Sequence, residues 1–109
     1  MMWMPIRLVT EVFETQNGVP VVTETHEHKV LGEKQSVKRT EHYKMLKVGQ
    51  QPAATFSLWY AEFLEANVTV GGRRFEPTQL ICGGIRYQIE RDYNEAGDDM
   101  VELNCTKIM

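Results

Sequence analysis

Alternation of apolar and polar residues, interrupted by turn signals two residues long, constrains the fold of this chain more than any other feature. The segment IRLVTEVFE at 6–14 alternates at the period of a half-buried strand. Asn17-Gly18 then favours a tight hairpin, because both turn positions require a positive φ. The run at 19–32 therefore predicts a second strand that is antiparallel to the first.

The same pattern returns in the C-terminal half of the chain. Gly-Gly pairs at 71–72 and 83–84 each predict a turn, and the second pair lies between two strand-like runs. After a further turn at 94–99, the chain ends in another alternating run. On the first of the last two strands, the side chains that should share one face are those of Ile85, Tyr87, Ile89, Arg91 and Tyr93. On the final strand, Val101, Leu103 and Cys105 should likewise share one face.

The segment at 53–67, AATFSLWYAEFLEAN, fits both helical and strand spacing. Its aromatic residues and the preceding Pro52 favour a strand as far as Tyr60. The chain of 109 residues has room for one domain, which we assign to 1–109. Because nearly every link between strands is of hairpin length, a mainly β fold is expected, a small antiparallel β-barrel of five to six strands.

Residues 32–49 do not alternate, and they predict one short α-helix around 36–48, inserted between strands. Ser36 can accept a hydrogen bond as the N-cap, and Gly49 can end the helix in a left-handed turn. About three turns of helix are too short to be stable alone. We therefore expect the inserted helix and its flanking loops, at about 29–54, to rest on the barrel or on a neighbouring molecule.

Charge is unevenly distributed along the chain. The net charge of −3 argues against a protein that binds free duplex DNA. Residues 29–47 hold six bases and two acids, whereas the remainder holds six bases and thirteen acids. Such asymmetry indicates either a surface that meets a particular partner or an ordinary solvated helix face.

The two cysteines, Cys82 and Cys105, lack the spacing of a metal or redox motif. Each falls in a strand-like run, where a free cysteine is usually a small core residue, and a cross-strand disulfide would require an oxidising compartment. The N-terminal MMWMPI is too short and uncharged for a signal peptide, and no run is long enough to span a membrane. These features predict a cytosolic protein with reduced thiols.

Sites for chemistry are sparse in the sequence. His26 and His28 share a strand face with Glu24, but a zinc site needs further ligands, and His42 lies on the expected helix. The sequence has no nucleophile motif and no phosphate-binding loop. We therefore expect no catalytic site, no cofactor and no bound metal, and we do not expect an enzyme.

Arg91 interrupts the otherwise apolar strand face between Ile89 and Tyr93. It can form a cross-strand pair with Glu102 on the returning strand. The alternative role is a contact with a neighbouring subunit.

Two blocks of the sequence resemble one known family. The first is GEKQSV at 32–37, followed by Glu41 and Tyr43, and the second is GIRYQIERDY at 84–93, followed by ELNC at 102–105. In this order and spacing they resemble the head-closure proteins of long-tailed bacteriophages, also called stoppers or head–tail adaptors. The chain departs from the family pattern at 63–80, where a tight turn would be expected.

The resemblance implies a structural virion protein: a small β-barrel with one inserted helix, which assembles as a ring at the virion neck. The ring retains packaged DNA and presents the docking surface for the tail. The implied partners are further copies of the chain, the portal adaptor ring, the tail-terminator and tail proteins and, without sequence specificity, the packaged DNA, but no membrane. The isolated subunit can be monomeric in the host cytoplasm, since such rings assemble on the preceding ring.

A loop that closes the channel is also implied by the family, and the segments flanking the helix, 29–35 and 48–54, are the candidates. We expect the basic segment to form the subunit interface or to line the channel. The residues assigned to this surface are Lys34, Lys38, Arg39, Glu41, Lys44 and Lys47.

Three other functions stay open on the sequence alone. Two of them are a small enzyme of unrecognised type, for which the sequence offers no residue set, and a tail-terminator or another connector ring of the same viral class. The other is a nucleic-acid-binding barrel of the OB or Sm-like kind, in which Trp59, Tyr60 and Phe63 would stack on bases, although Glu62 and Glu65 beside them are acidic.

Overall fold

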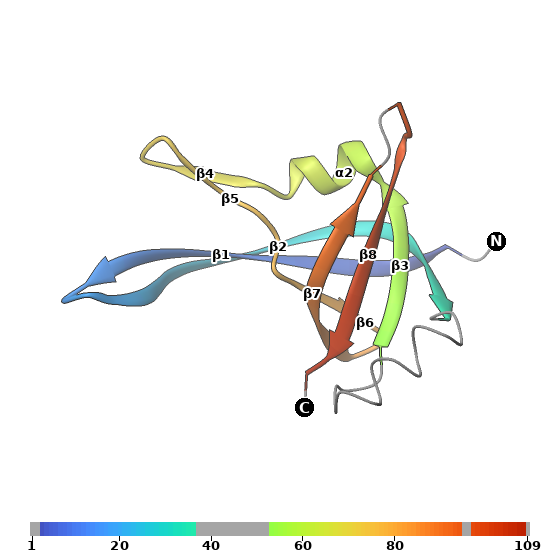
Figure 1. Cartoon of the computed structure of the whole chain (residues 1–109), viewed down its shortest axis with the longest axis horizontal. Helices are drawn as coiled ribbons and strands as arrows, with labels where there is room; N and C mark the ends of the chain where they lie inside the picture. The colour runs from blue at the N-terminus through green and yellow to red at the C-terminus, as the bar shows by residue number, and fades with distance from the viewer. Residues whose placement is uncertain (1–2, 37–52, 95–96, 109) are drawn as a thin grey trace.

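The computed structural model describes residues 3–36, 53–94 and 97–108. These residues form eight strands and one short helix (Figure 1). The elements are β1 (Met4–Gln16), β2 (Val19–Ser36), β3 (Ala53–Trp59), α2 (Tyr60–Glu65), β4 (Val68–Val70), β5 (Arg73–Phe75), β6 (Gln79–Cys82), β7 (Ile85–Tyr93) and β8 (Met100–Lys107).

Six of the strands hydrogen-bond in a closed ring, in the order β1-β2-β3-β8-β7-β6, and every pairing in the ring is antiparallel. The prediction of a mainly β fold with a small closed antiparallel sheet is therefore confirmed. Asn17 and Gly18 both have positive φ, 52° and 79°, as the β1–β2 turn requires. The pairs at 71–72 and 83–84 also have positive φ and form the β4–β5 and β6–β7 turns.

The core fills the inside of the closed sheet. Side chains of alternate residues point inward, so each strand contributes every second residue. The residues whose exposure is lowest include Ile6, Leu8, Phe56, Leu58, Leu80, Val101 and Leu103. Phe56 meets Tyr87 edge to face, with ring centres 5.2 Å apart. Burial of these apolar side chains is the main stabilising term for the fold.

The β1–β2 hairpin continues beyond the closed sheet as a projecting arm (Figure 1). β1 pairs with β6 only as far as Val9, and β2 begins to pair with β3 only at Gly32. The intervening strand residues therefore pair chiefly with each other. The small β4–β5 hairpin projects in the same direction, and Phe13 of the arm meets Phe75 edge to face at 5.2 Å.

The segment at 53–67, whose spacing fits both a strand and a helix, forms a strand followed by a helix. The strand β3 ends at Trp59, and α2 starts at Tyr60, one residue earlier than the strand prediction allowed. Tyr60 N donates a hydrogen bond to Asp99 O at 2.8 Å, and Thr10 Oγ1 donates one to Ala66 O at 2.7 Å. These two bonds tie the ends of α2 to the β7–β8 turn and to β1, over one mouth of the sheet.

The expected loop at 29–35 is instead strand. Residues through Ser36 belong to β2, because they pair with β1 and then with β3. Residues 53–54, expected to lie in the other flanking loop, begin β3. The rest of the predicted helix around 36–48 lies outside the described residues, as does segment 48–52.

A β-bulge corrects the predicted face of β7. The register shifts between Ile89 and Arg91, so that Ile89 opposes the buried Cys105 whereas Arg91 opposes Asn104. The extra residue, Glu90, moves the following side chains to the other side of the sheet. Arg91 and Tyr93 are consequently exposed, whereas Tyr87 stays in the core.

Candidate functional site

Lys34 is the predicted interface residue that falls within the described ranges; Lys38, Arg39, Glu41, Lys44 and Lys47 fall outside them. In the β2–β3 register Lys34 opposes Phe56, which places it on the inner side of the sheet, near the end of β2. Its Nζ is 5.9 Å from the centre of the Tyr87 ring, within range of a cation–π attraction. Lys34 is nevertheless exposed, so it puts a positive charge at the mouth of the closed sheet where β2 ends.

The two cysteines are free and buried, as the sequence predicted for core residues. Burial raises the pKa of the Cys82 thiol, and the charge of Lys34 partly opposes that rise. Burial also raises the pKa of Cys105, to about 12, and the Glu90 carboxylate adds to the effect. Because the thiolate is the nucleophile, neither cysteine is suited to covalent chemistry in the folded protein.

The predicted pair of Arg91 and Glu102 is offset by the bulge. Glu102 opposes Tyr93, so Arg91 and Glu102 are diagonal neighbours on the outer side of the sheet. The ion pairs between described residues are Arg7–Glu27, His26–Glu24, His28–Glu65 and Arg74–Glu76, and they do not include this pair. Arg91 is exposed, and its alternative role as a contact with a neighbouring subunit stays a prediction.

An acidic groove crosses the outer side of β2, β3 and β8 beside the end of β7. It has a volume of about 340 Å³ and is lined by Glu33, Gln35, Ser57, Tyr93, Asp98, Met100 and Glu102. Asp98 Oδ1 accepts a hydrogen bond from Met100 N at 3.0 Å. The three carboxylates of the groove give this face a negative potential, which repels phosphate backbones.

An apolar stripe lies next to the acidic groove, on the same outer side. We define it as Trp3, Pro5, Leu31, Trp59 and Met100. The registers pair Pro5 with Leu31 and Trp59 with Met100, and the pairing of Gly32 with Leu58 brings Leu31 alongside Trp59. The stripe therefore runs across four neighbouring strands, β1, β2, β3 and β8.

Two tryptophans form the centre of the stripe. The rings of Trp3 and Trp59 stack with centres 6.1 Å apart and planes 8° apart. Leu31 is 54% exposed and Trp59 is 46% exposed, so large apolar side chains face solvent where the alternation calls for polar ones. Sequence reasoning missed this surface. A signal for it was present, because Leu31 directly follows Val30, and two adjacent apolar residues on a strand place one of them on the outer side of the sheet.

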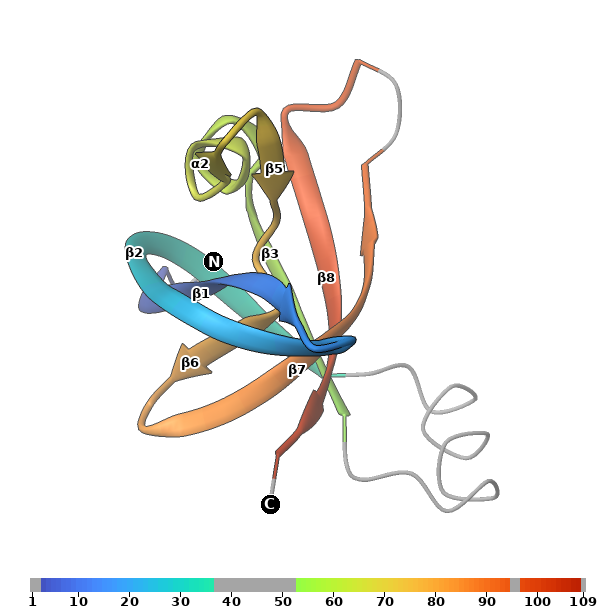
Figure 2. The same ribbon diagram turned by 90° about the vertical axis from the view of Figure 1, so that its left-hand side faces the viewer.

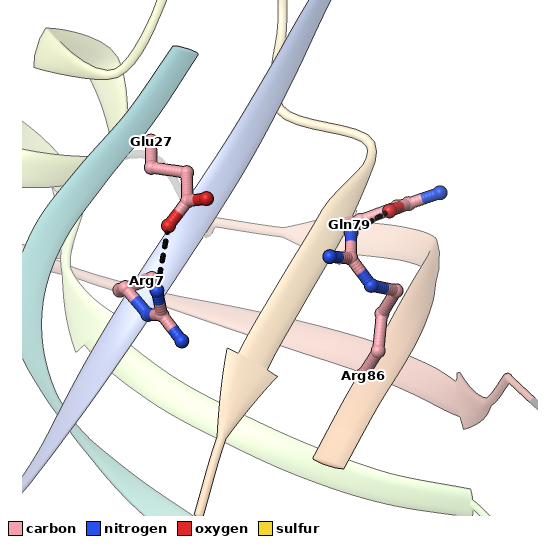
Figure 3. A network of polar contacts seen from close by, with 4 residues as sticks. All are labelled: Arg7, Glu27, Gln79 and Arg86. Carbon is pink, nitrogen blue, oxygen red and sulfur yellow. Dashed lines mark hydrogen bonds and ion pairs between the residues drawn. The ribbon is translucent and has the colours of Figure 1, made fainter. Parts of the chain in front are cut away.

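A basic depression borders the other side of the stripe. It has a volume of about 250 Å³, and Arg7 and Lys29 line it with Pro5, Ile6, Ile81, Gly83 and Gly84. Arg7 Nη1 donates to Glu27 Oε1 at 2.8 Å, and Arg86 Nη1 donates to Gln79 Oε1 at 2.6 Å (Figure 3). The long polar side chains shield the outward Ile81, which is 8% exposed.

The histidines lie on strand β2 and share a face with Glu24, as the spacing predicted, since His28, His26 and Glu24 oppose Leu8, Thr10 and Val12. His26 Nε2 is 3.5 Å from Glu24 Oε1, and His28 Nε2 is 4.0 Å from Glu65 Oε2 of α2. Within the part of the chain that the structure describes, no three His, Cys, Asp or Glu side chains are grouped as metal ligands. His42 lies outside the described ranges.

The aromatic residues considered for base stacking are not presented together. Phe63 is 5% exposed and belongs to the core, and Tyr60 packs against that core. Trp59 is exposed, but its ring face is covered by Trp3, and the acidic groove lies beside it. This arrangement disfavours a single-strand binding surface, which needs accessible rings within positive potential.

A comparison with models of known protein families finds no match, and a comparison with curated proteins finds no relative. In the described residues, no helix is long and apolar enough to cross a membrane.

Proposed function

We propose that this chain is a structural subunit of the neck of a long-tailed bacteriophage, a head-closure protein that forms a ring. The observation that carries the proposal is the connection between β2 and β3. These strands are neighbours in the closed sheet, yet the chain between them is the segment 37–52, which holds four of the twelve Lys and Arg residues. A closed sheet with one charged insertion suits a protein that binds other proteins and does not catalyse a reaction.

The blocks that carry the family resemblance are separated by β3 in the sheet, and residues of both line the acidic groove. GEKQSV ends β2 and enters the insertion, whereas GIRYQIERDY and ELNC lie in β7 and β8, which pair with each other. Lys34 adds a positive charge close to the point where the insertion leaves β2. Positive charge here would hold packaged DNA through its phosphates without reading sequence.

The proposal is tested by electron microscopy of particles assembled with and without the protein. A head-closure protein predicts that particles lacking it lose their DNA and carry no tails. Filled heads without tails, or filled heads beside tails of abnormal length, would instead indicate a tail-terminator or another connector. Normal tailed particles without the protein would refute a role in the neck.

A charge-reversal variant tests the basic segment itself. Lys38→Glu, Arg39→Glu and Lys44→Glu together should block the joining of heads and tails while the subunit stays folded. The matched control reverses three exposed bases outside the segment, Arg74, Arg86 and Lys107. Equal loss of tailed particles in both triple variants would show that the segment has no special role.

A further inference from the structure

The tip of the arm is a second exposed apolar surface on this chain. Residues 15–23 contain no charged side chain, and Val19 and Val21 are 59% and 38% exposed. Because they are two residues apart on β2, they share a face of the hairpin. Gln16 opposes Val19 and Glu14 opposes Val21 on β1, so one carboxylate flanks the apolar face.

The arm tip and the apolar stripe lie at opposite ends of the molecule. In Figure 1 the β1–β2 tip points away from the end that holds the N-terminus and the end of β3, and in Figure 2 the side with the tip faces the viewer. Seven residues of β1 beyond Val9 extend the arm by about 20 Å at the usual rise of a strand. A rigid arm of this length, braced by Phe75, does not fold back onto the stripe of its own chain.

We propose that the arm tip of one copy docks on the apolar stripe of a second copy of this chain, with Val19 and Val21 against Leu31 and Trp59. Two different patches of one subunit then meet, which is a heterologous contact that propagates into a ring or a chain. The inference deepens the proposed function, since it names the contact between ring subunits.

Charge complementarity supports this arrangement. Lys29 lies two residues from Leu31 on the same side of β2 and makes no ion pair with another described residue. Glu14 beside the arm's valines likewise makes none within the described ranges. Docking the tip on the stripe brings these opposite charges together at the rim.

A symmetric contact between two stripes is the alternative to this arrangement. In one orientation of such a pair, Glu33 and Glu102 of the two copies approach each other, and like charges at the rim of an interface suppress association. In the other orientation the acidic groove of each copy faces the basic depression of its partner, and the cross-linking rates distinguish that pair from the proposed contact. The arm tips of both copies would also remain exposed in such a pair.

Disulfide trapping distinguishes these contacts. Two differently tagged copies, one carrying Val21→Cys and the other Leu31→Cys, are mixed at high protein concentration, so that even a weak contact between subunits is populated. They are then oxidised mildly, and the cross-linked species are counted by mass. Native Cys82 and Cys105 are buried, so the introduced thiols are the reactive ones. We expect the mixed pair to cross-link about tenfold faster than a control pair of Leu31→Cys with Thr69→Cys on the β4–β5 hairpin.

Charge reversal provides the second measurement. Lys29→Glu in the copy with the stripe cysteine should slow cross-linking several-fold, and Glu14→Lys in the copy with the arm cysteine should restore the rate. Faster self-linking of Leu31→Cys than of the mixed pair would establish a symmetric contact and overturn the proposal. A mixed pair no faster than the Thr69→Cys control would also overturn it.

The cross-linking experiment and the electron microscopy of particles test the contact and the neck function separately. If the mixed pair fails to cross-link but particles without the protein lose DNA, the contact is wrong and the neck function stands. If the pair cross-links but particles without the protein are normal, the contact stands and the neck function fails.

Discussion

Gly32 lies so close to Ile6 of the neighbouring strand that a Cβ at position 32 would be 2.5 Å from Ile6 Cδ1. The same Cβ would be 3.1 Å from the Ser57 carbonyl oxygen of β3. Gly32 pairs with both β1 and β3 and is buried, so it marks the point where β2 turns from the arm into the closed sheet. Backbone approach here depends on the missing side chain.

Replacing Gly32 with alanine should therefore lower the free energy of unfolding by about 1–3 kcal/mol, as overpacking of a filled core does. Urea denaturation measures the change. The variant Ile6→Val removes the clashing Cδ1 and alone should cost about 0.5–1.5 kcal/mol. The double variant should lose less unfolding free energy than the sum of the two single losses. A loss equal to that sum would show that Ile6 is not the obstacle.

The hydroxyl of Thr10 provides a second test of the core. Thr10 is 1% exposed, and its Oγ1 donates to Ala66 O at 2.7 Å, at the end of α2. Thr10→Val keeps the shape but leaves this carbonyl without its donor, which should cost about 1–3 kcal/mol in urea denaturation. The control is Thr23→Val, which removes a longer bond of 3.3 Å on the exposed arm and should change stability by no more than about 0.5 kcal/mol.

Arg73 should hold the β4–β5 hairpin against the arm. Its guanidinium carbon lies 5.0 Å from the centre of the Phe13 ring and 4.9 Å from that of Phe75. Arg73→Gln should weaken this contact by about 0.5–1 kcal/mol and speed amide hydrogen exchange in β4 and β5. Arg74→Gln removes only an exposed ion pair with Glu76 and should leave the exchange rates nearly unchanged. Equal effects of the two variants would exclude a bracing role for Arg73.

Much of the fold could be predicted because its signals are local. Alternation fixes which side of a strand is buried, and the Asn17-Gly18 and Gly-Gly turns fix which strands pair. The β7 bulge was missed because one extra residue in a strand has no signature in a single sequence. Ile89, Arg91 and Tyr93 keep their spacing of two whether or not the bulge intervenes.

The surface was harder to predict than the core for a different reason. The apolar stripe joins Trp3 to Trp59, residues that are brought together only when β1, β2 and β3 pair. Each of them alone looks like an ordinary aromatic residue in a strand. The basic segment, in contrast, is continuous in sequence, so charge counting found it without any knowledge of the fold.

Cys105 predicts how stability depends on alkaline pH. Its thiol has a pKa of 9.0 when unperturbed, and burial raises the pKa to about 12 in the folded chain. Below pH 9.0 both states keep the proton, so this group makes no difference to stability. Between pH 9.0 and about 12 the unfolded chain releases the proton while the folded chain retains it, so the free energy of unfolding falls as pH rises.

The loss from this one thiol should reach at most about 4 kcal/mol near the upper end of that range. Urea denaturation at a series of alkaline pH values measures it, and Cys105→Ala is the comparison, because the variant keeps every other titratable group of the chain. The variant starts less stable at neutral pH, since a buried side chain has been shortened. Its stability should nevertheless decline less steeply above pH 9, so the two curves converge; curves that stay parallel would mean that Cys105 ionises as easily in the folded chain as in the unfolded one.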